Sequence, residues 1–118
     1  MAIEVFVFGS NLAGRHGKGA ALEARKKYGA VYGVGVGLTG NSYALPTKGY
    51  NLEVLSLDVI SGYVDEFKQF ARINTEYTFR VTRIGCGLAG YADAQIVPMF
   101  HNSPCNCILP DGWRRYEQ

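Results

Sequence analysis

The stretch that decides the fold is Val5-Phe6-Val7-Phe8-Gly9-Ser10-Asn11-Leu12-Ala13-Gly14-Arg15-His16-Gly17-Lys18-Gly19-Ala20-Ala21-Leu22. Its apolar start predicts a strand, which runs into a glycine-punctuated loop and then into an alanine-rich helix. Glycines let the backbone approach a ligand closely and adopt positive φ, and the first N–H groups of a helix point at any anion placed there. This order of strand, loop and helix predicts a cradle for a phosphate or another anion.

The whole chain has 118 residues and is 47% hydrophobic, which fits one domain over residues 1–118. The formal net charge of +2 is too small to indicate a nucleic-acid binder, although Arg15, Lys18 and the run Arg25-Lys26-Lys27 concentrate positive charge beside the glycine loop. The three cysteines are an odd count, and no apolar run reaches the ~18 to 20 residues of a membrane span. The first residues lack the pattern of a signal peptide. We therefore expect a soluble, cytoplasmic protein with no membrane partner.

Strands and helices are expected to alternate along the rest of the chain. The patterns predict strands at residues 3–8, 42–45, 78–84 and 107–109, helices at 17–28, 57–74 and 93–101, and a loop or edge element at 30–41. Gly29 is expected to stop the first helix, Pro46 to end the second strand, and Asp93 to cap the last helix. This order predicts an α/β fold whose loops gather at the strand ends, where such sheets bind ligands.

A second glycine loop, Arg83-Ile84-Gly85-Cys86-Gly87-Leu88, follows a predicted strand. It is the third of three motifs in order, after Gly17-Lys18-Gly19-Ala20-Ala21-Leu22 and Tyr43-Ala44-Leu45-Pro46-Thr47-Lys48. With these three motifs the chain resembles a macrodomain. The nearest likeness is to the compact branch that contains ADP-ribosyl-glutamate hydrolases and ADP-ribose-1″-phosphate phosphatases, and it covers most of residues 3–109.

The resemblance implies a three-layer α/β/α macrodomain-like sandwich with a mixed, mostly parallel central sheet and a cleft for ADP-ribose or a related NAD-derived nucleotide. The first glycine loop would contact the distal ribose, and the second would wrap the diphosphate. The ligand-binding residues that it implies are Gly9, Ser10, Asn11, Gly17, Lys18, Gly19 and Ala20, followed by Gly85, Cys86, Gly87, Leu88, Ala89, Gly90 and Tyr91. An ADP-ribosylated protein is a further partner of this kind of domain.

The same resemblance raises the question of catalysis. In the hydrolase branch, a lysine at the position of Lys48 attacks the anomeric carbon of the distal ribose, and an aspartate after the second glycine loop assists. A lysine is nucleophilic only when its pKa is lowered, because an ammonium ion has no lone pair. Ala89 occupies the place of the aspartate here, and the nearest carboxylate is that of Asp93.

Three functions therefore stay open. The first is binding of ADP-ribose, with hydrolysis of ADP-ribosyl esters or of ADP-ribose-1″-phosphate in which Lys48 and Asp93 are the candidate catalytic residues. The second is a non-catalytic reader or sponge of an ADP-ribose-type signal. The third is a small nucleic-acid-binding module, which the modest net charge disfavours. No acidic residue stands after Phe8 to accept from adenine, so the adenine contact is unassigned.

Several of these residues also have structural explanations. Lys48 fits an ordinary exposed lysine equally well. The Asn11 amide can form a hydrogen bond with the backbone of its own turn, and Tyr91 can pack in the protein without contacting a ligand. His16 is expected to be solvated, and Cys86 to be a small buried hydrophobe rather than a nucleophile.

His101, Cys105 and Cys107 are the residues that most invite a metal-binding interpretation. Their spacing matches no zinc signature, and a fourth ligand is missing. We therefore expect no metal ion and no cofactor.

Overall fold

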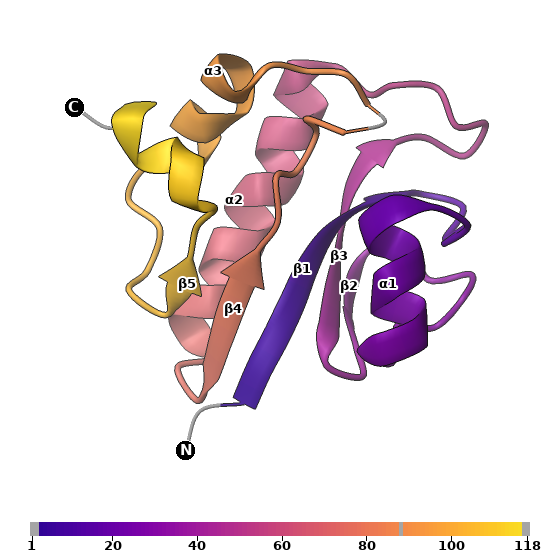
Figure 1. Cartoon of the computed structure of the whole chain (residues 1–118), viewed down its shortest axis with the longest axis horizontal. Coiled ribbons are helices and arrows are strands. Elements are labelled where there is room, and N and C mark those ends of the chain that lie inside the picture. Colours follow the sequence, from indigo (N-terminus) through magenta and orange to yellow (C-terminus); the bar gives the residue numbers. More distant parts are fainter. Residues whose placement is uncertain (1–2, 88, 117–118) are drawn as a thin grey trace.

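The first strand, β1 (Ile3–Asn11), is the centre of a five-stranded sheet in the computed structural model, which describes residues 3–87 and 89–116 (Figure 1). It pairs in parallel with β3 (Ser42–Lys48) on one side and with β4 (Tyr77–Val81) on the other. Beyond β3 lies the antiparallel edge strand β2 (Gly37–Thr39), and beyond β4 the parallel strand β5 (Cys107–Ile108). The α/β class and the mixed sheet are as predicted, and the sheet places its parallel strand ends together.

In the described residues, three α-helices and two short 3₁₀-helices accompany the sheet. Their bounds are α1 (Gly19–Lys27), α2 (Leu57–Ile73), α3 (Asp93–Ile96), η1 (Val97–Phe100) and η2 (Asp111–Tyr116). The apolar spacing that predicted α2 corresponds to its fully buried face, formed by Ile60, Val64, Phe67 and Ala71. Among the described residues, no helix is both long and apolar enough to cross a membrane.

Alternate residues of β1 join two different apolar clusters. Val5 and Val7 pack in the cluster that contains the buried face of α2, whereas Phe6 and Phe8 pack with Ala21 and Ala24 of α1. Successive side chains of a strand point to opposite faces of the sheet. The two helices therefore cover opposite faces of β1, which explains why residues 5–8 of this strand are all apolar.

The prediction that Pro46 ends the second strand is wrong, because β3 continues through Pro46 to Lys48. Pro46 lies opposite Ser10 where the register between β1 and β3 shifts, and β2 accompanies β3 only as far as Ala44. An irregular ladder with one open side tolerates a residue that has no N–H to donate. The extension of β3 delivers Lys48 to the edge of the sheet where β1 ends.

Of two predicted helix boundaries, one agrees with the structure and one does not. Gly29 follows α1 with a φ of +78°, as its predicted role as a helix stop requires. Asp93, however, does not cap α3, because Ala92 is the capping residue and its N–H donates to the side chain of Gln95 at 2.9 Å. The Asp93 carboxylate is therefore available to accept hydrogen bonds from other groups.

Candidate functional site

A cavity of about 800 Å³ opens where β1 and β3 end and the chain leaves β4. These strand ends lie at the upper edge of the sheet in Figure 1. Its walls come from the loop after β1 with the start of α1, from the end of β3, and from residues 82–89. Ligand pockets in proteins usually have ~300 to 1,000 Å³, so this cavity is large enough for a nucleotide-sized molecule. It is the position at which open parallel sheets bind ligands.

The first glycine loop lies in the cavity wall. All of its predicted ligand-binding residues line the cavity: Gly9, Ser10, Asn11, Gly17, Lys18, Gly19 and Ala20. The Asn11 amide donates to the carbonyl of Arg15 and accepts from its N–H, both at 2.9 Å, so its side chain shapes the loop. In the described chain, no side chain caps the start of α1 and its first turn holds no carboxylate. The free N–H groups of that turn favour an anion.

Part of the second glycine loop forms another wall of the cavity. Gly85, Cys86, Gly87 and Ala89 line the cavity, whereas Leu88 lies outside the described residues. Gly90 and Tyr91 are not among the lining residues of the described chain. The Tyr91 hydroxyl donates to the carbonyl of Leu55 at 2.6 Å, and this bond ties the loop to the segment before α2. Tyr91 therefore supports the wall from behind.

Four cationic side chains line the cavity, namely Arg15, Lys18, Lys48 and Arg83, and the described lining residues include no carboxylate. Like charges that line one concave surface raise the local concentration of anions. Lys48 reaches the cavity as the last residue of β3, next to the buried Thr47. The site is therefore built for a ligand that carries negative charge.

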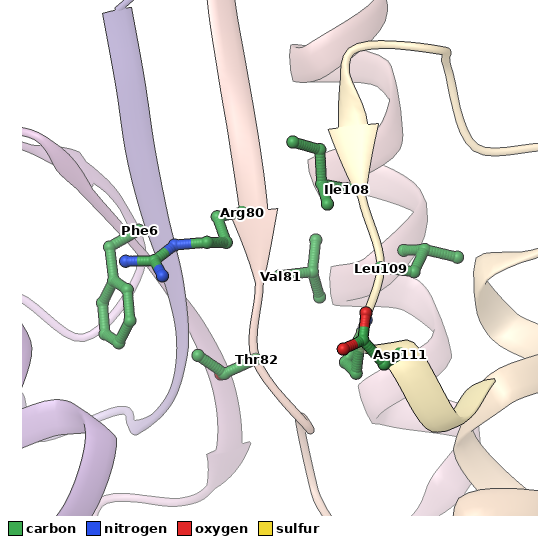
Figure 2. A pocket seen from close by; sticks show the side chains of 8 residues that line it. Phe6, Arg80, Val81, Thr82, Ile108, Leu109 and Asp111 are labelled. Carbon is green, nitrogen blue, oxygen red and sulfur yellow. The ribbon is translucent and has the colours of Figure 1, made fainter.

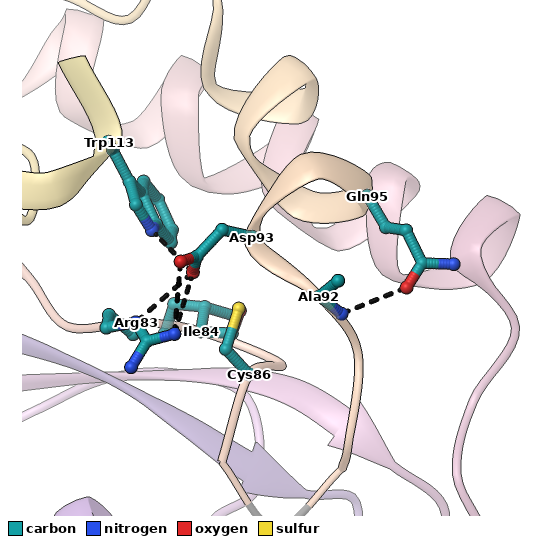
Figure 3. Close-up of polar contacts among 7 residues, drawn as sticks. All are labelled: Arg83, Ile84, Cys86, Ala92, Asp93, Gln95 and Trp113. Carbon is teal, nitrogen blue, oxygen red and sulfur yellow. Dashed lines mark hydrogen bonds and ion pairs between the residues drawn. The ribbon is translucent and has the colours of Figure 1, made fainter. Parts of the chain in front are cut away.

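One of these cations, Arg83, is held by a carboxylate behind the wall (Figure 3). Its Nε and a terminal nitrogen donate to Asp93 at 3.1 Å, and the indole N–H of the buried Trp113 donates to the same carboxylate at 3.0 Å. The Cys86 thiol, the Trp113 indole and Arg83 together hold the pKa of Asp93 below its ordinary value. Asp93 thus stays ionised and orients Arg83, and it is not among the described residues that line the cavity.

Cys86 lies between this carboxylate and the cavity. Burial, reinforced by Asp93, raises the pKa of the Cys86 thiol to about 11. A thiol with such a pKa stays protonated at neutral pH and is a poor nucleophile. This environment agrees with the prediction that Cys86 is not a nucleophile, but the side chain is half-buried rather than buried.

The sequence patterns did not identify several residues of the cavity wall. Tyr32, Leu52 and Thr82 were not noticed at all, whereas Arg15, Ala21, Thr47 and Arg83 were seen only as parts of a charge cluster or a motif. Tyr32 and Leu52 belong to two loops that come together only in the folded chain. The glycines between residues 33 and 37 were the one available signal, because a Cβ on Gly35 would lie 2.3 Å from the Asn11 carbonyl oxygen.

His16 is completely buried, so the prediction that it is solvated is wrong. Its ring meets the Phe8 ring edge-on, with centroids 5.3 Å apart, and neither ring nitrogen has a hydrogen-bond partner among the described residues. Burial lowers the pKa of His16. The nearby backbone of Val34 opposes this lowering, and the positive charge of Arg25 reinforces it. His16 is therefore a neutral part of the core beneath the first loop.

We expect the buried His16 to make the protein less stable in mild acid. Because its pKa is lowered in the folded state, the unfolded chain takes up the proton first as the pH falls below ~6.5, and stability decreases until the lower folded pKa is reached. Urea unfolding between pH 8 and pH 5 should show a smaller pH dependence for His16→Phe than for the wild type. His101→Gln, which changes the exposed second histidine, should keep the wild-type dependence. Parallel curves for wild type and His16→Phe would contradict the prediction.

A smaller hollow of about 270 Å³ lies between β4 and β5 (Figure 2). Val81 of β4, Ile108 of β5 and Leu109 just after β5 line it, and Thr82 lines both this hollow and the larger cavity. Its volume is below the usual range for ligand pockets. The larger cavity is therefore the candidate functional site.

In comparisons with known proteins, no family model, no curated protein and no solved structure matched this chain. Among the described residues, no three His, Cys, Asp or Glu side chains come together as a metal site would require. The fold and the cavity define an α/β protein with a cationic, nucleotide-sized cavity at the ends of its parallel strands.

Proposed function

We propose that the chain is a macrodomain-like protein that binds ADP-ribose or a related NAD-derived nucleotide in this cavity. The observation that carries the proposal is one cavity of about 800 Å³ that is lined by both glycine loops and four cations. A diphosphate needs several backbone N–H donors and little side-chain bulk around it. The second glycine loop supplies both, and the uncapped start of α1 adds N–H donors for the polar groups at the other end of the ligand.

The orientation of the ligand that we propose is the one that the resemblance to macrodomains implies. In the proposed complex, the first glycine loop holds the distal ribose and the second holds the diphosphate, with Arg83 aligned beside it. The helices on opposite faces of β1 would then be the outer layers of a three-layer α/β/α macrodomain-like sandwich.

A substitution in the second glycine loop tests this function. A Cβ on Gly87 would meet no atom within 4 Å, and Gly87 lines the cavity, so Gly87→Asp should fold and add a negative charge where the diphosphate would lie. Like charges placed together across an interface cost several kcal/mol, so we expect at least a tenfold loss of affinity (about 1.4 kcal/mol). Calorimetry with ADP-ribose at neutral pH measures the loss.

Gly87→Ala is the matched control, because it fills the same open space without charge and should bind ADP-ribose within a few-fold of the wild type. Thermal unfolding of both variants verifies that they fold. No heat and no thermal shift for the wild type at millimolar ADP-ribose would overturn the proposed function.

Binding without turnover is the favoured form of this function. The Asp93 carboxylate, the nearest replacement for the missing acid, is engaged by Arg83 and Trp113 and does not line the cavity in the described chain. Turnover of an ADP-ribosyl-glutamate substrate or of ADP-ribose-1″-phosphate that disappears in Lys48→Ala would instead identify a hydrolase. A steep loss of nucleic-acid affinity with salt would identify the nucleic-acid-binding alternative.

A further inference from the structure

Tyr32 is an aromatic side chain that lines the cavity and belongs to neither glycine loop. It lies in the segment between α1 and β2, and 55% of its surface is exposed. Exposed aromatic residues on a protein surface need no explanation by themselves. A half-exposed ring in the wall of the candidate site does call for an explanation, because a ligand in the cavity would be within reach of the ring.

The backbone around Tyr32 is fixed against the first glycine loop. The Gly33 N–H donates to the Gly14 carbonyl at 2.8 Å, and the Ser10 hydroxyl donates to the Gly35 carbonyl at 2.6 Å. The absence of a side chain at Gly35 allows its backbone to lie directly against Asn11. Tyr32 is therefore carried by a segment that is held against the first glycine loop at two points directly after it.

The ring itself is also supported. The Arg25 guanidinium carbon lies 5.4 Å from the centre of the Tyr32 ring, and the buried His16 ring meets it edge-on at 6.1 Å. A cation over an aromatic face and an edge-on ring are both favourable arrangements. An aromatic surface that is ordered before binding loses little entropy when a ligand ring is placed against it.

From this arrangement we propose that Tyr32 is a stacking platform for an aromatic ring of the bound nucleotide. The proposal rests on the proposed function and adds to it a residue that selects for ring-bearing ligands. The ring has two sources in NAD-derived nucleotides, the adenine base or an aromatic group on the distal ribose such as nicotinamide. Stacking is the shared chemistry, and the two sources are separated by the choice of ligand.

The test is calorimetry of the wild type, Tyr32→Phe and Tyr32→Ala with ADP-ribose, NAD and inorganic pyrophosphate. Base stacking on an aromatic side chain corresponds to about a 5- to 150-fold change in affinity, so Tyr32→Ala should lose affinity by a factor in this range. A loss with ADP-ribose identifies adenine as the stacked ring, and a loss confined to NAD identifies nicotinamide. Tyr32→Phe keeps the ring and should bind like the wild type.

Two further readouts separate stacking from a merely structural role. Inorganic pyrophosphate has no ring, so its affinity should be the same for the wild type and Tyr32→Ala. In proton NMR spectra, the ring protons of the stacked group should move upfield with the wild type and not with Tyr32→Ala. Equal affinities of the wild type and Tyr32→Ala for both nucleotides, or an equal loss for pyrophosphate, would overturn the proposal. Failure of the wild type to bind any nucleotide would instead overturn the proposed function, before a variant is made.

Discussion

Gly35→Ala should strongly destabilise the protein and disrupt the cavity. The new Cβ would lie 2.3 Å from the Asn11 carbonyl oxygen and 2.7 Å from that of Leu12, and neither backbone atom can move like the end of a flexible side chain. Overpacking of this kind typically costs ~1 to 3 kcal/mol, sometimes more, and here it forces apart the two segments that form one wall. We expect the free energy of unfolding in urea to fall by at least this amount, and ligand binding to weaken with it.

The chain supplies a matched control for this prediction. A Cβ on Gly62, in the exposed part of α2, would meet no atom within 4 Å. Because glycine is a poor helix former, Gly62→Ala should raise the free energy of unfolding by ~0.5 to 1 kcal/mol. If Gly35→Ala were as stable as the wild type, the close docking of the two segments would be refuted.

The second large effect is expected for Trp113→Ala. Trp113 is 1% exposed, packs against Phe100 with ring centroids 5.3 Å apart, and anchors η2 to the rest of the fold. Removing such a side chain typically costs ~3 to 5 kcal/mol, because a cavity remains in its place. Denaturant unfolding followed by far-UV circular dichroism measures the loss, and a value below about 1 kcal/mol would show that η2 contributes little.

Trp113→Phe separates packing from hydrogen bonding at the same position. Phenylalanine retains most of the apolar contact with Phe100 but removes the N–H that donates to Asp93 at 3.0 Å. We expect a smaller loss of stability than for Trp113→Ala. Because Asp93 also orients Arg83, the affinity for an anionic ligand should decrease in Trp113→Phe while the protein stays folded.

Much of the fold could be predicted because its signals are local. The run of apolar residues from Ile3 to Phe8 indicated a strand covered on both faces, and the spacing of the buried residues predicted α2 almost to its ends. Both glycine loops were recognisable at strand ends. Such patterns reflect the periodicity of single elements, which does not depend on the rest of the chain.

The errors arose where the surroundings determined the outcome. Pro46 is accommodated only because the ladder with β1 is irregular beside it, and His16 is buried only because Phe8 and Tyr32 pack around it. The sequence position of Asp93 predicted a helix cap, yet in the folded chain its carboxylate accepts hydrogen bonds from both Arg83 and Trp113.

The sequence by itself determined the strands, the main helices and the two glycine loops that meet at one edge of the sheet. Only the tertiary structure decided which side chains share the cavity with them. The segment that carries Tyr32 docks on the first glycine loop through contacts such as that of Ser10 with Gly35, and η2 brings Trp113 to Asp93. These contacts join residues that are distant in the sequence, and they form only when the packed elements bring the donor and the acceptor within hydrogen-bond distance. The local pattern of either segment carries no record of its partner.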